Sequence, residues 1–308
     1  MRFLVVGVGA IGSSYFAFLT RAGHEAVGLV KRGRKLKNLS VRGIWGEFEV
    51  PVKTVESPSE LGLTPEVVIL SVKSYDTRRA LENIREAVGR NTLIMIAQNG
   101  YGNYETAVEL YGEGKVILAR VIFGSEVLEP GSIRITVSAD DVVIGDPAGI
   151  VKEDYLKDLA HTFTEAGIPT RYEREVYKFL WDKIIYNCAL NPLGALLEVN
   201  YGTLAENPHT RELMDRIVEE VFEVTRSAGI ETFWKTAEEY LKVFYERLIP
   251  PTSAHYPSML ADVKKGKTEI DALNGAICRL GSKYGVATPT NRVITELVKA
   301  KELLNQGS

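Results

Sequence analysis

The chain has few of the side chains that most often bind metals or act as nucleophiles. Its 308 residues include only two cysteines, Cys188 and Cys278, and four histidines. No two of these six residues lie within five positions of each other, which argues against a local metal site of the CxxC or HxxxH type. We therefore expect the chemistry to use other groups, without a metal. The two isolated cysteines fit a reducing compartment such as the cytoplasm.

A strong net charge and a long apolar run are also absent. There are 37 basic and 40 acidic residues, which leaves a net charge of −3. Such a balance provides no single-sign field for holding nucleic acid or a membrane surface. No apolar run approaches the roughly 20 residues of a membrane span, and the first residues lack a signal-peptide cleavage pattern. We expect a cytoplasmic protein with a small-molecule substrate, no nucleic acid partner and no membrane.

The first part of the chain carries the pattern of an α/β protein. Up to about residue 172, short apolar runs alternate with longer amphipathic segments, as in a parallel sheet with helical crossovers. Turn residues between Arg120 and Gly145 predict antiparallel strands added to one edge of that sheet. The pattern predicts a doubly wound α/β sheet of the Rossmann type. Its expected strands are Met1–Val6, Ala26–Val30, Val67–Val72, Leu93–Ala97, Val116–Phe123 and Val142–Ile144.

After residue 172 the strand pattern is replaced by helical periodicity. Asn207 and Pro208 form a good helix start, and Gly229 a good stop. The chain is therefore expected to contain one domain over residues 1–172 and an all-α domain over residues 173–308. Helices are predicted over Val176–Leu197, Pro208–Ala228, Thr232–Leu248, Ser258–Lys264, Glu269–Tyr284 and Pro289–Asn305.

Residues Gly7 to Gly12 read GVGAIG and match the fingerprint G-x-G-x-x-G. They follow an apolar run and open a helix, which is the context that the fingerprint requires. Gly7 permits the tight turn, Gly9 lets the backbone approach a pyrophosphate, and Gly12 allows close packing of helix on sheet. The pattern predicts a dinucleotide site in the first domain. A glycine-rich turn without a ligand is the alternative.

A basic loop follows the second expected strand. An NAD-binding protein usually has an acidic residue about 20 residues after the fingerprint, where it holds the ribose 2′-hydroxyl. The window from Val30 to Lys35 reads VKRGRK and contains no carboxylate, while Glu25 comes too early. A cationic loop suits a 2′-phosphate, so this loop favours NADP(H). NAD(H) stays open as the cofactor, and an ordinary solvated loop stays open as the structure.

The segment Val176–Leu197 is apolar on almost all sides but carries a polar residue at every fourth position. Lys183, Asn187 and Asn191 fall within a stripe of about 80°. Because unpaired polar groups are costly to bury, this stripe must meet water, other polar groups or a ligand. A partly desolvated lysine could protonate an alkoxide as hydride reaches a carbonyl. A wet seam between domains is the alternative, and Pro192 is expected to kink or end the helix.

Further polar side chains occupy places where ligands are often bound. Lys73 and Asn99 each follow an expected buried strand, just beyond the carboxyl end, where doubly wound sheets bind ligands. Ser258 and Asp262 share one helical face, and Glu269 begins the next expected helix. Ordinary surface or loop polarity is the alternative for all five.

Together these features resemble the ketopantoate reductase family. The shared elements are GVGAIG, LSVKSYD, QNG, WDKIIYNCALNPLGAL, SMLADVKKGKTEIDALNG and YGVATPTN, in the family's order from residue 1 to about 300. The resemblance implies a Rossmann domain followed by a helical domain like that of 6-phosphogluconate dehydrogenase. It implies NAD(P)H-dependent reduction of 2-dehydropantoate to (R)-pantoate, a step in pantothenate and coenzyme A biosynthesis.

The resemblance also implies roles for single residues. Lys183 takes the place of the general acid, and Asn187 and Asn191 take substrate-binding places. Ser258 falls where the family contacts the substrate carboxylate, and Glu269 where a carboxylate orients substrate and lysine. Asn99 is expected to bind substrate as well, and Asp262 looks structural. Arg32 is the best match for a 2′-phosphate contact, with Lys31 as the alternative. The expected cofactor-binding residues are Gly7, Gly9, Ala10, Ile11, Gly12, Arg32, Lys73, Asn99 and Glu269.

Two other functions stay open. One is a related hydroxy-acid dehydrogenase with the same architecture and another small oxo-acid substrate. The other is a nucleotide-sensing protein without catalysis, which would be expected to lack the lysine–asparagine row that is intact here. The sequence does not reveal the oligomeric state, and a homodimer is one candidate assembly.

Overall fold

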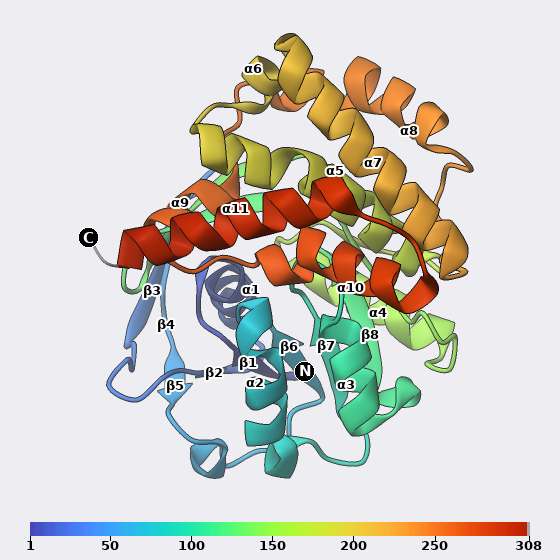
Figure 1. Cartoon of the computed structure of the whole chain (residues 1–308). Coiled ribbons are helices and arrows are strands. Elements are labelled where there is room, and N and C mark those ends of the chain that lie inside the picture. The colour runs from blue at the N-terminus through green and yellow to red at the C-terminus, as the bar shows by residue number, and fades with distance from the viewer. Residues whose placement is uncertain (307–308) are drawn as a thin grey trace. The chain divides into compact units, whose positions relative to one another are not determined.

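The computed structural model of the protein describes residues 1–306, which form two compact units (Figure 1). The first unit runs from Met1 to Tyr177, and the second begins at Lys178. The last strand of the first unit is β12 (Thr170–Tyr172), close to the boundary expected near residue 172. The division between the units falls in the first turn of helix α5 (Val176–Leu197).

The first unit is built on an eight-stranded sheet with the order β12-β11-β8-β7-β6-β1-β2-β5. The six strands from β5 to β8 run parallel, and their labels follow this order in Figure 1. Numbered along the chain, these six give the order 3-2-1-4-5-6 of a Rossmann sheet, so the predicted fold class is confirmed. The strands are β1 (Arg2–Val6), β2 (Glu25–Leu29), β5 (Lys53–Val55), β6 (Val67–Leu70), β7 (Leu93–Ile96), β8 (Val116–Arg120), β11 (Val142–Gly145) and β12.

The prediction for residues 120–145 is only partly correct. Strand β11 does join the main sheet antiparallel to β8. The hairpin before it was expected at the same edge, which is wrong, because it belongs to a second, four-stranded sheet of order β4-β3-β10-β9. Strands β3 and β4 were not predicted, since their short runs are rich in polar residues. The four strands are β3 (Asn38–Gly43), β4 (Phe48–Pro51), β9 (Phe123–Glu129) and β10 (Ser132–Ser138).

Helix α1 (Ala10–Arg21) explains why the hairpin leaves the main sheet. It packs against strands of both sheets, and its aromatic side chains contact rings of the small sheet. Tyr15 lies 6.3 Å from Phe123, and Phe18 lies 5.0 Å from Phe48, measured between ring centroids. The small sheet therefore covers a helix that would otherwise expose large aromatic surface. The contact of Tyr15 with Phe123 joins segments more than 100 residues apart, and local periodicity in the sequence does not reveal such a contact.

The helices of the first unit lie on both faces of the main sheet. Helix α1 contacts α4 (Glu153–Ala166) on one face, and α2 (Thr77–Asn83) contacts α3 (Asn103–Tyr111) on the other. Figure 1 shows α2 and α3 side by side in front of the strands. Every residue of β6 and β7 is buried, as expected for parallel strands covered on both faces.

The second unit is helical, with no strand among residues 178–306. Most of the predicted helices are confirmed. The one expected from Thr232 begins at Ala237, where the Thr236 side chain accepts from the Glu239 N–H. The one expected from Glu269 begins at Asn274, after a separate helical turn over Ile270–Ala272. A short helix from Tyr201 was missed. Among residues 1–306, no helix combines the length and the apolar character needed to cross a membrane. The helices are α5, α6 (Tyr201–Glu206), α7 (Pro208–Ser227), α8 (Ala237–Val243), α9 (Ser258–Lys264), α10 (Asn274–Tyr284) and α11 (Pro289–Gln306).

Helix α5 passes through Pro192 and does not end there, contrary to one of the two outcomes expected for this proline. Its last residue is Leu197, and the next residue, Glu198, has a φ of 59°, the left-handed conformation common just after a helix. The Val199 N–H donates to the Gly194 carbonyl over 3.2 Å, which is the main hydrogen bond of a Schellman motif. The proline therefore lies inside a helix that ends five residues later with a common C-terminal motif.

The glycines of the fingerprint have different structural requirements. Gly7 has a φ of +94°, and a Cβ added there would lie 2.7 Å from the Val72 nitrogen. A Cβ on Gly12 would lie 2.0 Å from the Gly7 carbonyl oxygen and 2.5 Å from the Ser71 Oγ. A Cβ on Gly9 would meet no atom within 4 Å. Packing alone thus demands glycine at residues 7 and 12, whereas Gly9 leaves open space.

We expect Gly12→Ala to lower the free energy of unfolding by about 3 kcal/mol, because the new methyl group collides with backbone that cannot easily move. Urea unfolding followed by circular dichroism measures this loss. Gly9→Ala is the matched control and should cost less than about 1 kcal/mol, the usual scale for an N-cap change. Equal losses in the two variants would contradict the packing explanation.

Candidate functional site

The predicted cofactor residues of the first unit are gathered by the main sheet itself. The fingerprint loop follows β1, Lys73 follows β6 and Asn99 follows β7, and these three strands are neighbours. Between β1 and β6 the connections change direction, and doubly wound sheets bind ligands at the carboxyl ends of such a pair. Arg32 lies beyond the end of β2, the next strand along.

The fingerprint loop has the features that a pyrophosphate group requires. Gly9 is the N-cap of α1, no side chain caps this helix end, and its first turn carries no acidic residue. The first N–H groups of a helix have no partner within it, and its N-terminus carries the positive end of the dipole. Together with the open space at Gly9, this loop fits the anionic centre of a dinucleotide.

Ser71 fixes the fingerprint loop to the neighbouring strand. Its hydroxyl donates to the Gly7 carbonyl oxygen over 2.8 Å. The loops after β1 and β6 are therefore joined by one side chain. Sequence reasoning did not identify Ser71, since a serine after a strand has no periodic signal, and only its place in LSVKSYD could have drawn attention to it.

A buried hydrogen-bond network joins the loops after β6 and β7. The Gln98 Nε2 donates to the Val72 carbonyl and to the Thr77 hydroxyl, both over 2.7 Å. The Thr77 hydroxyl donates to the Asn103 Oδ1 over 2.7 Å, and the Asn103 Nδ2 donates to the Asn99 carbonyl over 2.9 Å. Gln98, Thr77 and Asn103 are all buried. This network, also missed from the sequence, ties together the loops that carry Lys73 and Asn99.

The basic side chains of this loop differ in whether they pair with a carboxylate. The Lys31 ammonium lies 3.6 Å from the Asp76 carboxylate, and that of Lys35 lies 2.9 Å from Glu60. The hydrogen bond that Lys35 donates to Glu60 raises the pKa of this lysine above its usual value. Arg32 is exposed, and its side chain makes no hydrogen bond or ion pair with any residue of the range 1–306. Of the two residues predicted to contact a 2′-phosphate, Lys31 is thus paired with a carboxylate, whereas Arg32 has no ion pair among residues 1–306.

In the second unit, α5 presents the lysine–asparagine row. Lys183 is half-buried, and Asn187 and Asn191 are only 8% and 5% exposed. The Asn191 Oδ1 accepts from the Tyr201 hydroxyl over 2.8 Å. Burial raises the pKa of Tyr201 far above its usual value, so the phenol stays a neutral donor. The amide of Asn187 makes no hydrogen bond with any residue that the structure describes, which leaves it available for a ligand.

Ser258 and Glu269 lie on the elements that follow. Ser258 is the exposed first residue of α9, and its hydroxyl makes no hydrogen bond within residues 1–306. Glu269 is half-buried and directly precedes a helical turn, Ile270–Ala272. The preceding residue, Thr268, is held by a 2.6 Å hydrogen bond from its N–H to Glu302. Sequence reasoning missed this anchor, which fixes the backbone next to Glu269.

The thiols and other potential metal ligands show no sign of a reactive centre. Burial raises the pKa of the Cys188 thiol far above its usual value, as expected for a packing residue on α5. Within residues 1–306, no group of three or more His, Cys, Asp and Glu side chains is arranged to hold a metal ion.

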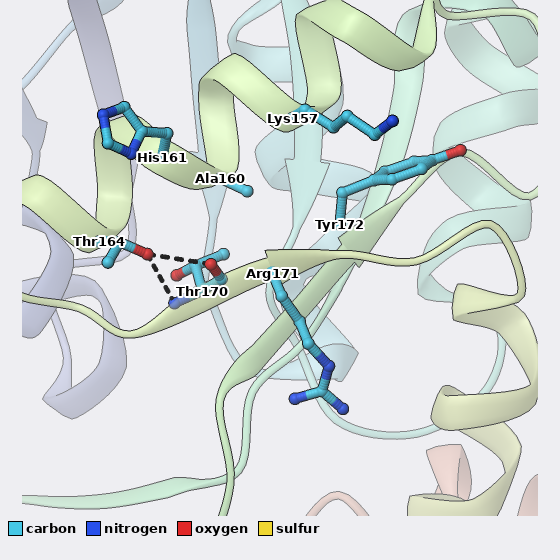
Figure 2. Close-up of a pocket in the computed structure, with 7 residues that line it drawn as sticks. All are labelled: Lys157, Ala160, His161, Thr164, Thr170, Arg171 and Tyr172. Carbon is cyan, nitrogen blue, oxygen red and sulfur yellow. Dashed lines mark hydrogen bonds between the residues drawn. The ribbon is translucent and has the colours of Figure 1, made fainter.

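An open cavity of about 380 Å³ lies elsewhere, between α4 and the edge strand β12 (Figure 2). It contains none of the predicted site residues. Two of the cations that line it already have partners, because Lys157 lies 2.7 Å from Glu153 and Arg171 lies 2.8 Å from Asp140. These ion pairs make the cavity a weak candidate for an anionic ligand, and we do not assign it to the site.

The sheet order and the open glycine loop define a Rossmann-type α/β protein with a loop suited to a dinucleotide, followed by a helical C-terminal part. Comparison with known proteins identifies the family. Residues 3–149 match the family model described as Ketopantoate reductase PanE/ApbA, and residues 175–302 match its C-terminal counterpart, Ketopantoate reductase PanE/ApbA C terminal. The chain therefore belongs to the ketopantoate reductase family, and the resemblance drawn from the sequence is confirmed.

Individual relatives match along nearly the whole chain. The chain is 70% identical to 2-dehydropantoate 2-reductase of Aquifex aeolicus, over 99% of this chain and 98% of the relative. It is 32% identical to the enzyme of the same name from Pyrococcus horikoshii, over 100% of both.

Two solved structures extend the comparison to the fold. A PanE/ApbA family ketopantoate reductase from Ralstonia eutropha has a TM-score of 0.87 and 29% identity, covering 99% of this chain and 100% of the other. D-Mandelate dehydrogenase, solved with NADH and anilino(oxo)acetate, has a TM-score of 0.89 and 26% identity, with the same coverage.

Proposed function

We propose that this chain reduces 2-dehydropantoate to (R)-pantoate with NADPH, a step of pantothenate and coenzyme A biosynthesis. The observation that carries the proposal is the 70% identity to a 2-dehydropantoate 2-reductase over 99% of the chain. The chemistry of the side chains agrees, because reduction of a 2-oxo acid needs a proton donor and hydrogen-bond donors rather than a thiol or a metal.

The first unit would hold the cofactor. The helix N-terminus at α1 and the space at Gly9 suit the pyrophosphate, and the exposed Arg32 suits a 2′-phosphate. Lys73 and Asn99, at the ends of β6 and β7, would line the nicotinamide end. We assign cofactor binding to Glu269 of the second unit and, in the first unit, to Gly7, Gly9, Ala10, Ile11, Gly12, Arg32, Lys73 and Asn99.

The second unit would supply the proton and hold the substrate. When bound, the nicotinamide supplies the hydride that adds to the ketone carbon. The Lys183 ammonium donates a proton from Nζ to the ketone oxygen, where negative charge develops. Asn187 and Asn191, one and two turns along α5, would donate hydrogen bonds to the substrate.

Three further residues complete the proposed substrate site. The Ser258 hydroxyl, which has no partner among the described residues, would donate to the substrate carboxylate. The Glu269 carboxylate would accept from the substrate hydroxyl and orient the Lys183 ammonium. Asn99 would contact the substrate as well as the cofactor.

The proposal also covers the cellular location and the oligomeric state of the enzyme. A cytoplasmic location fits two free cysteines, one of them buried. A homodimer is the assembly we propose, and light scattering after gel filtration measures it directly.

The similarity to D-mandelate dehydrogenase supports a second candidate, reduction of a different 2-oxo acid with NADH. A panel of initial rates separates the two. We expect the highest kcat/KM for 2-dehydropantoate with NADPH, because only that substrate offers a hydroxymethyl group to the polar row. A higher value for the 2-oxo acid of mandelate, or for any 2-oxo acid without the hydroxymethyl group, would reject the pantoate assignment.

Lys183→Ala is expected to lower kcat by ~10²-fold or more, the usual effect of removing a positioned acid. Binding of NADPH, measured by fluorescence titration, should stay within about twofold of the wild-type value. The matched control is Lys178→Ala, which removes a lysine of the same helix that pairs with Glu231 over 3.2 Å. A near-normal kcat in Lys183→Ala, or an equal loss in the control, would disprove the role of general acid.

Arg32→Ala is expected to weaken NADPH binding by roughly tenfold, the scale of one lost charge-assisted hydrogen bond, with little change for NADH. Isothermal titration with each nucleotide gives both affinities. Lys35→Ala serves as the control, since the ammonium of Lys35 is engaged by Glu60. Equal weakening of the two nucleotides by Arg32→Ala would mean that Arg32 does not bind the 2′-phosphate.

A further inference from the structure

Pro192 leaves one carbonyl of α5 without its normal partner. In an α-helix the N–H of each residue donates to the carbonyl four positions earlier, and proline has no N–H. The carbonyl affected is that of Cys188, a residue with 0% exposure that directly follows Asn187 in α5. A buried carbonyl without a donor costs free energy comparable to a lost hydrogen bond, so another donor is required.

Asn274, the first residue of α10, provides that donor. Its Nδ2 lies 3.1 Å from the Cys188 carbonyl oxygen and 3.0 Å from the Asn291 Oδ1. The side chain of Asn274 is completely buried, so water does not compete for these bonds. The amide thus stands in place of the N–H that Pro192 lacks.

The neighbours of Asn274 determine which way its amide faces. Glu220 is a carboxylate and can only accept, so the Asn291 Nδ2, 2.7 Å away, must be the donor of that pair. The Asn291 Oδ1 is then an acceptor, as is the Cys188 carbonyl. Both therefore require the Nδ2 of Asn274, and the assignment follows from the chemistry of the whole network.

The network reaches four helices of the second unit. Glu220 on α7 accepts the Thr290 N–H over 2.7 Å and the Asn291 N–H over 2.9 Å, at the start of α11. The Asn291 Oδ1 accepts a hydrogen bond from Asn274 on α10, and Asn274 also donates to the Cys188 carbonyl on α5. An ordinary residue at position 192 would satisfy the Cys188 carbonyl inside α5, and this connection to α10 would not be needed.

We propose that Asn274 is a positioning residue, whose amide fills the gap in α5 left by Pro192 and so keeps Lys183, Asn187 and Asn191 in one straight row. The same residue begins α10 five positions after Glu269, so its bond to α5 also sets the Glu269 segment against that row. The expected effect on catalysis rests on the proposed function. The expected effect on α5 rests on the hydrogen-bond network alone.

Hydrogen exchange of α5 tests the network without reference to activity. In Asn274→Ala, amides of α5 around Cys188 should exchange roughly tenfold faster or more, because a buried carbonyl loses its donor. Pro192→Ala restores an N–H to the helix, so Asn274→Ala should have a much smaller effect on exchange in that background. The comparison is a double-mutant cycle. Asn274→Ala removes the contact with Asn291 in both backgrounds, so that loss cancels when the two effects are subtracted.

Kinetics then test the positioning role. Asn274→Ala should lower kcat with 2-dehydropantoate by roughly tenfold, and Pro192→Ala should recover most of that loss. Asn207→Ala is the matched control. It removes the amide that caps α7 and costs stability, but it leaves the network intact, so its kcat should stay near the wild-type value.

Each result has a separate meaning. Unchanged exchange in Asn274→Ala, or equal acceleration with and without Pro192→Ala, would overturn the proposal at the level of the helix. Altered exchange with an unchanged kcat would overturn the positioning role. If Asn274→Ala does not fold, recovery of folded protein by Pro192→Ala supports the proposal, and failure to recover it counts against it. A wild-type enzyme inactive on 2-dehydropantoate would reject the proposed function but not the exchange result.

Discussion

The burial of α5 on almost every side constrains all the polar groups that this helix carries. Ile185 and Ala189 are fully buried on it, so an unpaired polar atom beside them would be costly. Tyr201 supplies a hydrogen-bond partner for the Asn191 amide. Asn187 is the polar side chain of the row that the described residues leave unpaired. The Asn187 amide is therefore the group of this row that remains for a ligand.

Sequence periodicity predicted the elements of this fold better than their partners. Buried parallel strands and amphipathic helices report which residues are inside, and nearly all of those elements are confirmed. The hairpin β9–β10 was placed in the wrong sheet, because the choice depends on the rings of Phe48 and Phe123 packing on α1. Such a contact joins segments far apart in the chain, and no local pattern encodes it.

The same limit applies to the site. Polar residues at strand ends, or at every fourth position of an apolar helix, could be found from spacing and then matched to a family. Ser71 and Thr77 could not, because each acts through hydrogen bonds to backbone or side-chain groups distant in sequence. Their side chains hold other residues in place, a task that leaves no periodic or compositional signal.

The basic loop after β2 has a shape that does not depend on its arginines. Its backbone is held at Gly33, whose N–H donates to Glu56 over 2.8 Å, and Lys35 is held by Glu60. Arg32 and Arg34 are exposed. Exchanging these two side chains should therefore leave the scaffold unchanged, so that a change in coenzyme affinity after such an exchange would report on binding alone.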